Sequence, residues 1–289
     1  MIRLDAATVL LQWATGGLLF LWVTTRRREV GIGYGWLLRA VYAVLALGSA
    51  AAGLLVDPVP VRDACAVGAV VAATVALAVS IVRRKAGVAG ERARKERKAN
   101  RVAVMAGKPA PETVADPGPP RPTPVREFPP TLDIVAPVIG LVGLVSAGIA
   151  AGGPDGLAVA RTVAGALFLG AVSDAMLLGH WYLVQPGLGR APLNDLNRWL
   201  AIVWPIEVGA LLWPTGMLSV FSGTVDDGYG GVLGWFWLAC AVTTLALTFV
   251  TRAALKERAY SAVMAATGLL YLAILTAFGT DLVARAVLA

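Results

Sequence analysis

Two carboxylic acids and the single histidine lie within long apolar stretches of this sequence, where they could carry chemistry. Glu207 follows Pro205 by two residues, and Asp174 precedes His180 by six. An ionisable side chain inside hydrocarbon is costly, so it usually serves a function or pairs with another group. Proline frees a backbone carbonyl beside Glu207 for a ligand or a kink. These features predict a proton- or cation-binding site at Glu207 and Asp174, and hydrogen bonding of each acid to a neighbouring helix is the structural alternative.

His180 stands beside Trp181 and Tyr182, aromatic residues that are typical of a membrane interface. Imidazole titrates near neutral pH, so His180 is a candidate for relaying a proton or binding a lipid headgroup, and a structural interfacial residue is the alternative. Haem or quinone binding near His180 is a further alternative, with Met176 as a second haem ligand. Haem between helices often takes two axial ligands, and a metal usually needs three or more, so no cofactor and no metal site are predicted.

The connection that follows His180 is the most polar short loop of the chain. Arg190 and Arg198 could bind a phosphate or a carboxylate, or pair with Asp195. Asn194 or Asp195 could cap the next helix. Most of the unusual polar residues therefore fall on one predicted helical hairpin, where we expect a substrate- or proton-binding site. Its candidate residues are Asp174, His180, Arg190, Asn194, Asp195, Arg198 and Glu207.

The elements that position these residues are long and apolar. The hydrophobic fraction is 57% and the charged fraction 15%, whereas soluble domains carry about 25% charged residues. The apolar runs are about 20 residues long and continuous, as spanning helices require, and do not alternate as barrel strands do. Gly140–Gly143 and Gly165–Gly170 supply small residues for close helix packing. We therefore predict an all-α, polytopic transmembrane bundle of about eight helices: Ala6–Thr24, Gly35–Val56, Ala64–Val82, Leu132–Gly152, Leu157–Leu183, Trp199–Met217, Gly231–Val250 and Tyr260–Thr280.

The distribution of Lys and Arg predicts the orientation of this bundle. With these spans, 20 of the 25 basic residues fall in four connections on one side. Basic connections stay in the cytoplasm, so both termini are predicted outside. Asp281 and Arg285 then lie beyond the last span, on the external side. Arg39 and Arg161 lie near the ends of spans, where a long side chain can reach the interface.

A long hydrophilic segment divides the chain into helices in residues 1–82, a connection in residues 83–131 and helices in residues 132–289. Val88–Val104 could form a short charged helix, and Pro109–Pro130 is Pro-rich, so the connection is predicted to be flexible. It could dock anionic lipid or a cytoplasmic protein, or act as a solvated loop that fixes orientation. The net charge of +7 comes largely from such connections, so no nucleic-acid partner is predicted.

No nucleotide-binding or nucleophile motif is present, so an enzyme is not favoured. The abundance of Arg, Ala, Gly and Val is typical of a GC-rich bacterial genome. The leading hypothesis is a bacterial cell-membrane permease that moves a small molecule or ion with a proton. One alternative is a redox or assembly component that binds quinone or haem near His180. The other is a scaffold subunit that docks a partner through its basic loop.

Overall fold

The predicted helical bundle is confirmed. The computed structural model describes residues 4–83, 128–152, 154–185, 187–214, 216–257 and 259–289, and within them it has eight long helices, two short ones and no strand. Residues 84–127, which hold the predicted charged helix and most of the Pro-rich stretch, lie outside the described residues. The helices are α1 (Ala6–Thr25), α2 (Ile32–Leu55), α3 (Pro60–Val82), the 3-10 helix η1 (Pro130–Ile134), α5 (Val135–Ala150), α6 (Asp155–Val184), α7 (Ala191–Leu212), α8 (Leu218–Phe221), α9 (Val232–Ala254) and α10 (Tyr260–Val287).

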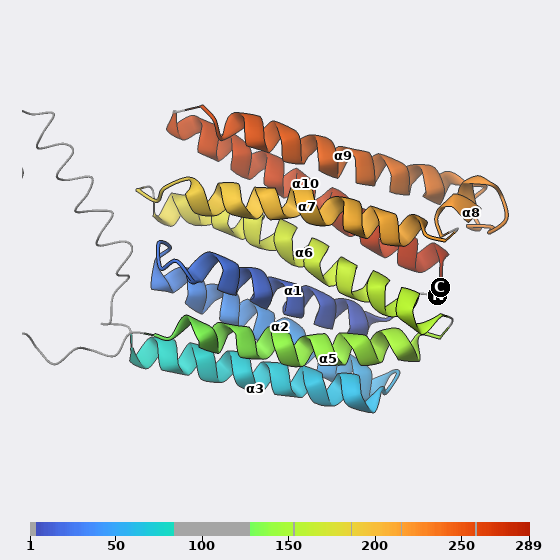
Figure 1. Ribbon diagram of the computed structural model, residues 1–289, viewed down its shortest axis with the longest axis horizontal. Helices are drawn as coiled ribbons and strands as arrows, with labels where there is room; N and C mark the ends of the chain where they lie inside the picture. The colour runs from blue at the N-terminus through green and yellow to red at the C-terminus, as the bar shows by residue number, and fades with distance from the viewer. Residues whose placement is uncertain (1–3, 84–127, 153, 186, 215, 258) are drawn as a thin grey trace, which may run out of the picture.

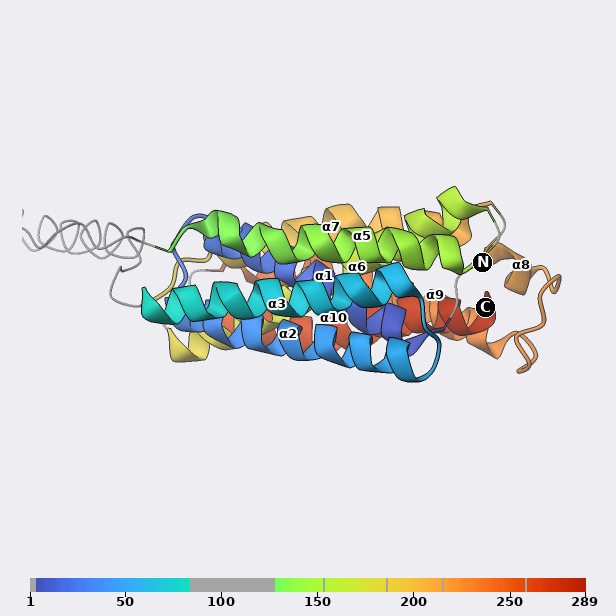
Figure 2. The ribbon, with the colours of Figure 1, turned by 90° about the horizontal axis from the view of Figure 1, so that it is seen from below.

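The long helices lie side by side as four pairs. From top to bottom in Figure 1 these are α9 with α10, α6 with α7, α1 with α2, and α3 with α5. The most central helix is α6, which contacts α1, α5, α7 and α10. Helix α1 begins and α10 ends at one end of the bundle, which we call the terminal end (Figures 1 and 2). We call the opposite end, where Arg27, Arg190 and Arg252 lie, the basic end.

Lipid is the solvent that suits the outer surface of this bundle. Seven of the long helices are long and apolar enough to cross a membrane. Large side chains on them face outward, as with Leu55 at 85% and Leu275 at 69% exposure, and a soluble monomer rarely tolerates apolar surface on this scale. The eighth, α7, has 22 residues and runs beside α6 but carries Asp195, Arg198 and Glu207. The chain is therefore a multi-pass helical membrane protein.

Two helix boundaries differ from the sequence-based expectation. Helix α7 begins at Ala191, because a proline such as Pro192 is well tolerated in a first turn. The prediction that Asn194 or Asp195 caps this helix is wrong. Both residues lie inside the helix, and Asn194 Nδ2 donates to the Arg190 carbonyl at 3.1 Å. The other difference is α10, which continues through Asp281 and Arg285 to Val287.

Helices α1 and α6 approach each other backbone to backbone. A Cβ added at Gly170 would lie 2.2 Å from the Gly16 carbonyl carbon, and one added at Gly16 would lie 1.8 Å from the Ala166 carbonyl oxygen. No side chain can occupy either position, so glycine is required at both. The predicted small-residue packing at 165–170 is confirmed at this crossing.

Arg39 lies on α2 but does not extend to the interface as predicted. Its Nε and Nη2 donate to Asp133 Oδ1 and Oδ2, each at 2.7 Å, and both side chains are buried. The ring of Phe128 lies 4.5 Å from the guanidinium carbon, and Ser80 Oγ accepts from Nη1 at 3.3 Å. A planar fork matched to a carboxylate satisfies the charge inside the protein. This ion pair fixes η1 against α2.

A second buried network joins α1 to α3 at the terminal end. The Arg62 guanidinium donates to Asp63 Oδ1 at 2.8 Å, to Asp5 Oδ2 and to the Asp57 carbonyl at 2.5 Å. Asp5 also caps α1, because its carboxylate accepts from the backbone N–H groups of Ala7 and Thr8. These charged residues, which the sequence placed in or near connections, are therefore structural.

The loop before α9 is held by Asp227. Its carboxylate accepts from the backbone N–H groups of Gly231 at 2.8 Å, Tyr229 at 2.9 Å and Leu233 at 2.8 Å. These donors, Gly231 first, hold the pKa of the Asp227 carboxyl below its ordinary value. Asp226 accepts from Gly228 N at 2.9 Å and is exposed.

Asp227 should therefore protect the backbone amides of this loop from hydrogen exchange, and the protection should depend on pH. A lowered folded-state pKa contributes stability above the unfolded value, about 3.9, and that contribution is lost as pH falls through the folded-state pKa. We expect Asp227→Asn to speed amide exchange in residues 229–233 at neutral pH, and the difference from the native chain to vanish in strong acid. Hydrogen-exchange mass spectrometry measures this. Asp226→Asn is the control, and an equal effect of that substitution would contradict the assignment.

Candidate functional site

Glu207 faces the interior of the bundle from α7. Its side chain is 0% exposed, and with both acids ionised neither carboxyl oxygen has a hydrogen-bond partner among the described residues. Its carboxyl group lies within hydrogen-bonding range of Asp281 on α10, and within electrostatic range of Arg285 on α10 and Arg161 on α6. Glu207 is five residues from the end of α7, which places it in the half of the bundle near the terminal end.

Asp281 and Arg285 form a buried pair one turn apart on α10. Arg285 Nε donates to Asp281 Oδ2 at 2.8 Å, and both side chains are buried. Gln12 joins them from α1 and donates from Nε2 to the Thr162 carbonyl at 2.7 Å. A Cβ added at Gly165 would lie 2.5 Å from Gln12 Nε2 and 2.6 Å from Asp281 Oδ1. The absence of a side chain at Gly165 lets these polar groups meet.

We call Glu207, Asp281, Arg285 and Gln12 the acid centre. Each contributes at least one buried polar atom without a hydrogen-bond partner among the described residues: Gln12 Oε1, Glu207 Oε1 and Oε2, Asp281 Oδ1 and Arg285 Nη2. Buried polar atoms are usually paired, because an unpaired one costs about 1–3 kcal/mol. With both acids ionised, the acid centre carries a formal charge of about −1. One proton neutralises it.

Arg161 binds backbone carbonyl groups and not a carboxylate. Its Nε donates to the Ala210 carbonyl at 2.9 Å and its Nη2 to the Trp213 carbonyl at 2.6 Å. These carbonyls lie at the end of α7, where the helix leaves acceptors unpaired. Like Arg39, Arg161 therefore satisfies its charge inside the protein, against the prediction that it reaches the interface. It also holds the end of α7 against α6.

A small cavity lies between the acid centre and the terminal end. It has a volume of about 20 Å³ and is lined by Arg285, Thr162, Arg62 and Asp5, among others. A space of this size can hold one water molecule. Arg285 lines this cavity and also belongs to the acid centre. The cavity therefore adjoins the acid centre on the side nearest to the terminal end.

Asp174 lies in a separate polar group. Tyr42 Oη donates to its Oδ1, while its Oδ2 has no partner among the described residues. Ser173 beside it accepts from Trp13 Nε1 at 2.8 Å. Asp174 is nine residues from Gly165 on α6, which is about 14 Å along the helix axis. The two acids singled out by the sequence, Asp174 and Glu207, therefore do not meet in one site.

His180 lies on an exposed face of α6. Its Nδ1 is 3.2 Å from Tyr271 Oη, and the two rings pack edge to face. Neither Asp174 nor Glu207 is its hydrogen-bond partner. Within the described part of the chain, no group of three or more His, Cys, Asp or Glu side chains could hold a metal ion.

The other predicted site residues lie at the basic end. Arg190 donates to the carbonyls of Leu255, Glu257 and Ala259, so it ties the α9–α10 connection to the start of α7. Asp195 pairs with Arg27 at 2.5 Å across an exposed surface. Arg198 and Asn194 line a groove between α7 and α9. None of these side chains contacts the acid centre.

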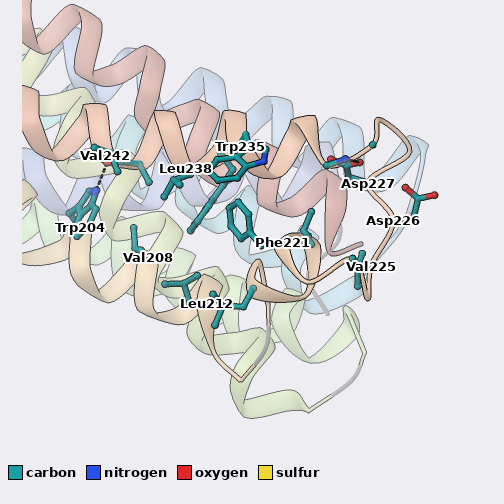
Figure 3. A pocket seen from close by; sticks show the side chains of 17 residues that line it. Trp204, Val208, Leu212, Phe221, Val225, Asp226, Asp227, Trp235, Leu238 and Val242 are labelled. Carbon is teal, nitrogen blue, oxygen red and sulfur yellow. Dashed lines mark hydrogen bonds between the residues drawn. The ribbon is translucent and has the colours of Figure 1, made fainter.

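A large apolar pocket lies beside α7, within one helical turn of Glu207 (Figure 3). It has a volume of about 950 Å³ and lies between α7, α8 and α9. Trp204, Val208 and Leu212 form its α7 wall, and Trp235 and Phe221 pack edge to face opposite, with ring centroids 5.5 Å apart. Helix α7 thus carries the apolar pocket and the buried acid on adjoining faces.

Sequence reasoning missed most of the acid centre. Glu207 was among the predicted site residues, but Gln12 was not, and Asp281 and Arg285 were placed beyond the last span on the external side. Their signal was present, because an Asp and an Arg four residues apart can pair on one helix face and let an apolar helix continue through them.

Comparison of the chain with protein-family models, curated proteins and solved structures gave no match. Its function is therefore inferred from its own residues.

Proposed function

We propose that the chain is a proton-linked permease of a bacterial cell membrane, which binds a proton at Glu207 and a small, mainly apolar molecule in the pocket between α7 and α9. The observation that carries this proposal is the fully buried Glu207, whose carboxyl group lies within hydrogen-bonding range of Asp281 in the buried Asp281–Arg285 ion pair. Two carboxyl groups this close can bond to each other only when one of them holds a proton, so the arrangement favours a proton site.

Protonation of Glu207 would change the balance of charge in the acid centre. When Glu207 is ionised, it competes with Asp281 for the positive charge of Arg285. When it is protonated, the Asp281–Arg285 pair is balanced and Glu207 becomes a hydrogen-bond donor. Gln12 Oε1 and Asp281 Oδ1 are acceptors without partners in this group. The two protonation states would therefore favour different side-chain arrangements around α7.

Helix α7 would couple proton binding at Glu207 to binding of the transported molecule in the pocket. Trp204 and Val208 line the pocket from the face of α7 that adjoins Glu207, within one helical turn of it. Pro205 lies inside the helix and cannot donate a backbone hydrogen bond, so α7 is weakest beside the acid. A shift of α7 on protonation would change the width of the pocket. The basic end would face the cytoplasm, as the positions of Lys and Arg predict.

Glu207→Gln tests the proposal. The full chain is placed in liposomes that contain a trapped pH-sensitive dye, and small apolar solutes are added under an imposed pH gradient. We expect some solutes to speed the collapse of the gradient with the native chain, and this effect to fall to that of protein-free liposomes with Glu207→Gln. Glutamine has a similar shape but cannot carry the proton. The infrared carbonyl band of the protonated Glu207 carboxyl should also disappear.

Glu257→Gln is the matched control, because Glu257 is an exposed acid at the basic end and its side chain contacts neither site. It should leave both readouts unchanged. Solute-driven proton movement that persists in Glu207→Gln at the native rate would refute the role of Glu207.

A further inference from the structure

The groove between α7 and α9 at the basic end has the features of an anion site. It has a volume of about 580 Å³ and is formed by the first turns of α7 and the last turns of α9. Arg198 lines it from α7 and Arg252 from α9. Neither guanidinium has an ion pair or hydrogen bond with another described residue. The groove thus presents two uncompensated positive charges from two different helices.

The acid in this groove does not cancel those charges. Asp195 already pairs with Arg27 at 2.5 Å on the α1 side. Asn197 crosses the floor of the groove, where its Nδ2 donates to the Thr248 carbonyl at 3.1 Å. Its Oδ1 is buried and has no partner among the described residues. The floor is therefore polar, while the two walls are basic.

The groove also has an apolar part that is exposed on the outer surface of the bundle. Ile202 and Phe249 line it and are 43% and 56% exposed. Farther along the same two helices, Trp204 Nε1 donates to the Ala241 carbonyl at 2.9 Å, and the apolar pocket of Figure 3 begins there. From Arg198 to Val208 is ten residues, about 15 Å along α7. That length is about half of a hydrocarbon core of about 30 Å, which is one leaflet.

From this charge pattern and this length we infer that the α7–α9 groove binds one anionic phospholipid, with its phosphate between Arg198 and Arg252 and an acyl chain along Ile202 and Phe249. The lipid fits better than a free phosphate, because a free anion would leave the apolar part of the groove unused. The site is separate from the acid centre, so this inference does not depend on proton-linked transport.

Native mass spectrometry of the full chain in detergent tests the inference. The protein is offered equal amounts of dioleoylphosphatidylglycerol and dioleoylphosphatidylcholine, which share their acyl chains and differ in net charge. Two arginines beside the headgroup predict a preference of about 30-fold for the anionic lipid at the tightest site. With Arg198→Gln and Arg252→Gln together, we expect the two lipids to bind almost equally. The apolar groove remains in that variant.

The control is Arg26→Gln with Lys256→Gln, which removes the same charge from the basic end outside the groove. This variant should keep the native preference. Millimolar inorganic phosphate should not displace the anionic lipid. An equal loss of preference in the control, or displacement by phosphate alone, would overturn the inference. Loss of proton movement in Glu207→Gln would leave it unaffected, so the two proposals can fail separately.

Discussion

Gly170→Ala is expected to destabilise the bundle strongly. The added methyl group would lie 2.2 Å from the carbonyl carbon and 2.5 Å from the carbonyl oxygen of Gly16. Both atoms belong to the backbone of α1, so the clash cannot be relieved by rotating a side chain. Overpacking a core usually costs about 1–3 kcal/mol, and we expect the upper end or more here because two central helices must separate. Thermal unfolding and size-exclusion chromatography in detergent measure the loss.

Gly268→Ala is the matched control on α10. Nothing lies within 4 Å of a Cβ added at Gly268, and its φ is not in the left-handed region. The same chemical change should therefore stabilise the protein slightly, by about 0.5–1 kcal/mol, since alanine favours a helix interior. Opposite signs for the two substitutions are the expected result. A stable, monodisperse Gly170→Ala protein would show that α1 and α6 are farther apart than described.

Arg39→Leu is expected to destabilise the protein by about 3–5 kcal/mol, because it leaves the buried Asp133 carboxylate without its partner. The additional substitution Asp133→Leu should recover most of this loss, since a pair of apolar residues of similar volume is often neutral or stabilising at a buried ion pair. The side chains of Arg39 and Asp133 are 3% and 1% exposed. Unfolding of the single and double variants in detergent with denaturant measures the coupling.

The Arg27–Asp195 pair provides the contrast. It has the same residue types and lies at the same end of the bundle, but its side chains are 51% and 37% exposed. Arg27→Leu should cost no more than about 1 kcal/mol, since water and salt screen such a pair. Equal losses at Arg27 and Arg39 would mean that burial does not govern the strength of these ion pairs.

The sequence predicted the positions of the helices better than it predicted which side chains meet between them. Span length and the continuity of apolar residues can be read along the chain, and the spans agree with the helices to within a few residues, apart from α7 and α10. The boundary of α10 was misplaced because Asp281 and Arg285 were counted as two charges in water. As an ion pair one turn apart they are compatible with a buried helix.

The separation of the predicted site residues has two physical causes. Asp174 and His180 are six residues apart, which is about 240° around a helix, so they face different neighbours. Helix geometry alone could have shown this. The partners of Glu207 could not be predicted in the same way, because they lie more than 70 residues later in the chain, on α10, which packs against α6.

The polar character of α7 has a consequence for biosynthesis. A segment that carries Asp195, Arg198 and Glu207 enters hydrocarbon poorly by itself. Helix α6 is made first and already holds Arg161, which binds the carbonyls at the end of α7. Asp281 and Arg285 leave the ribosome much later. The newly made α7 must therefore insert as a hairpin with α6, and the membrane integration of this segment becomes complete when the last helix arrives.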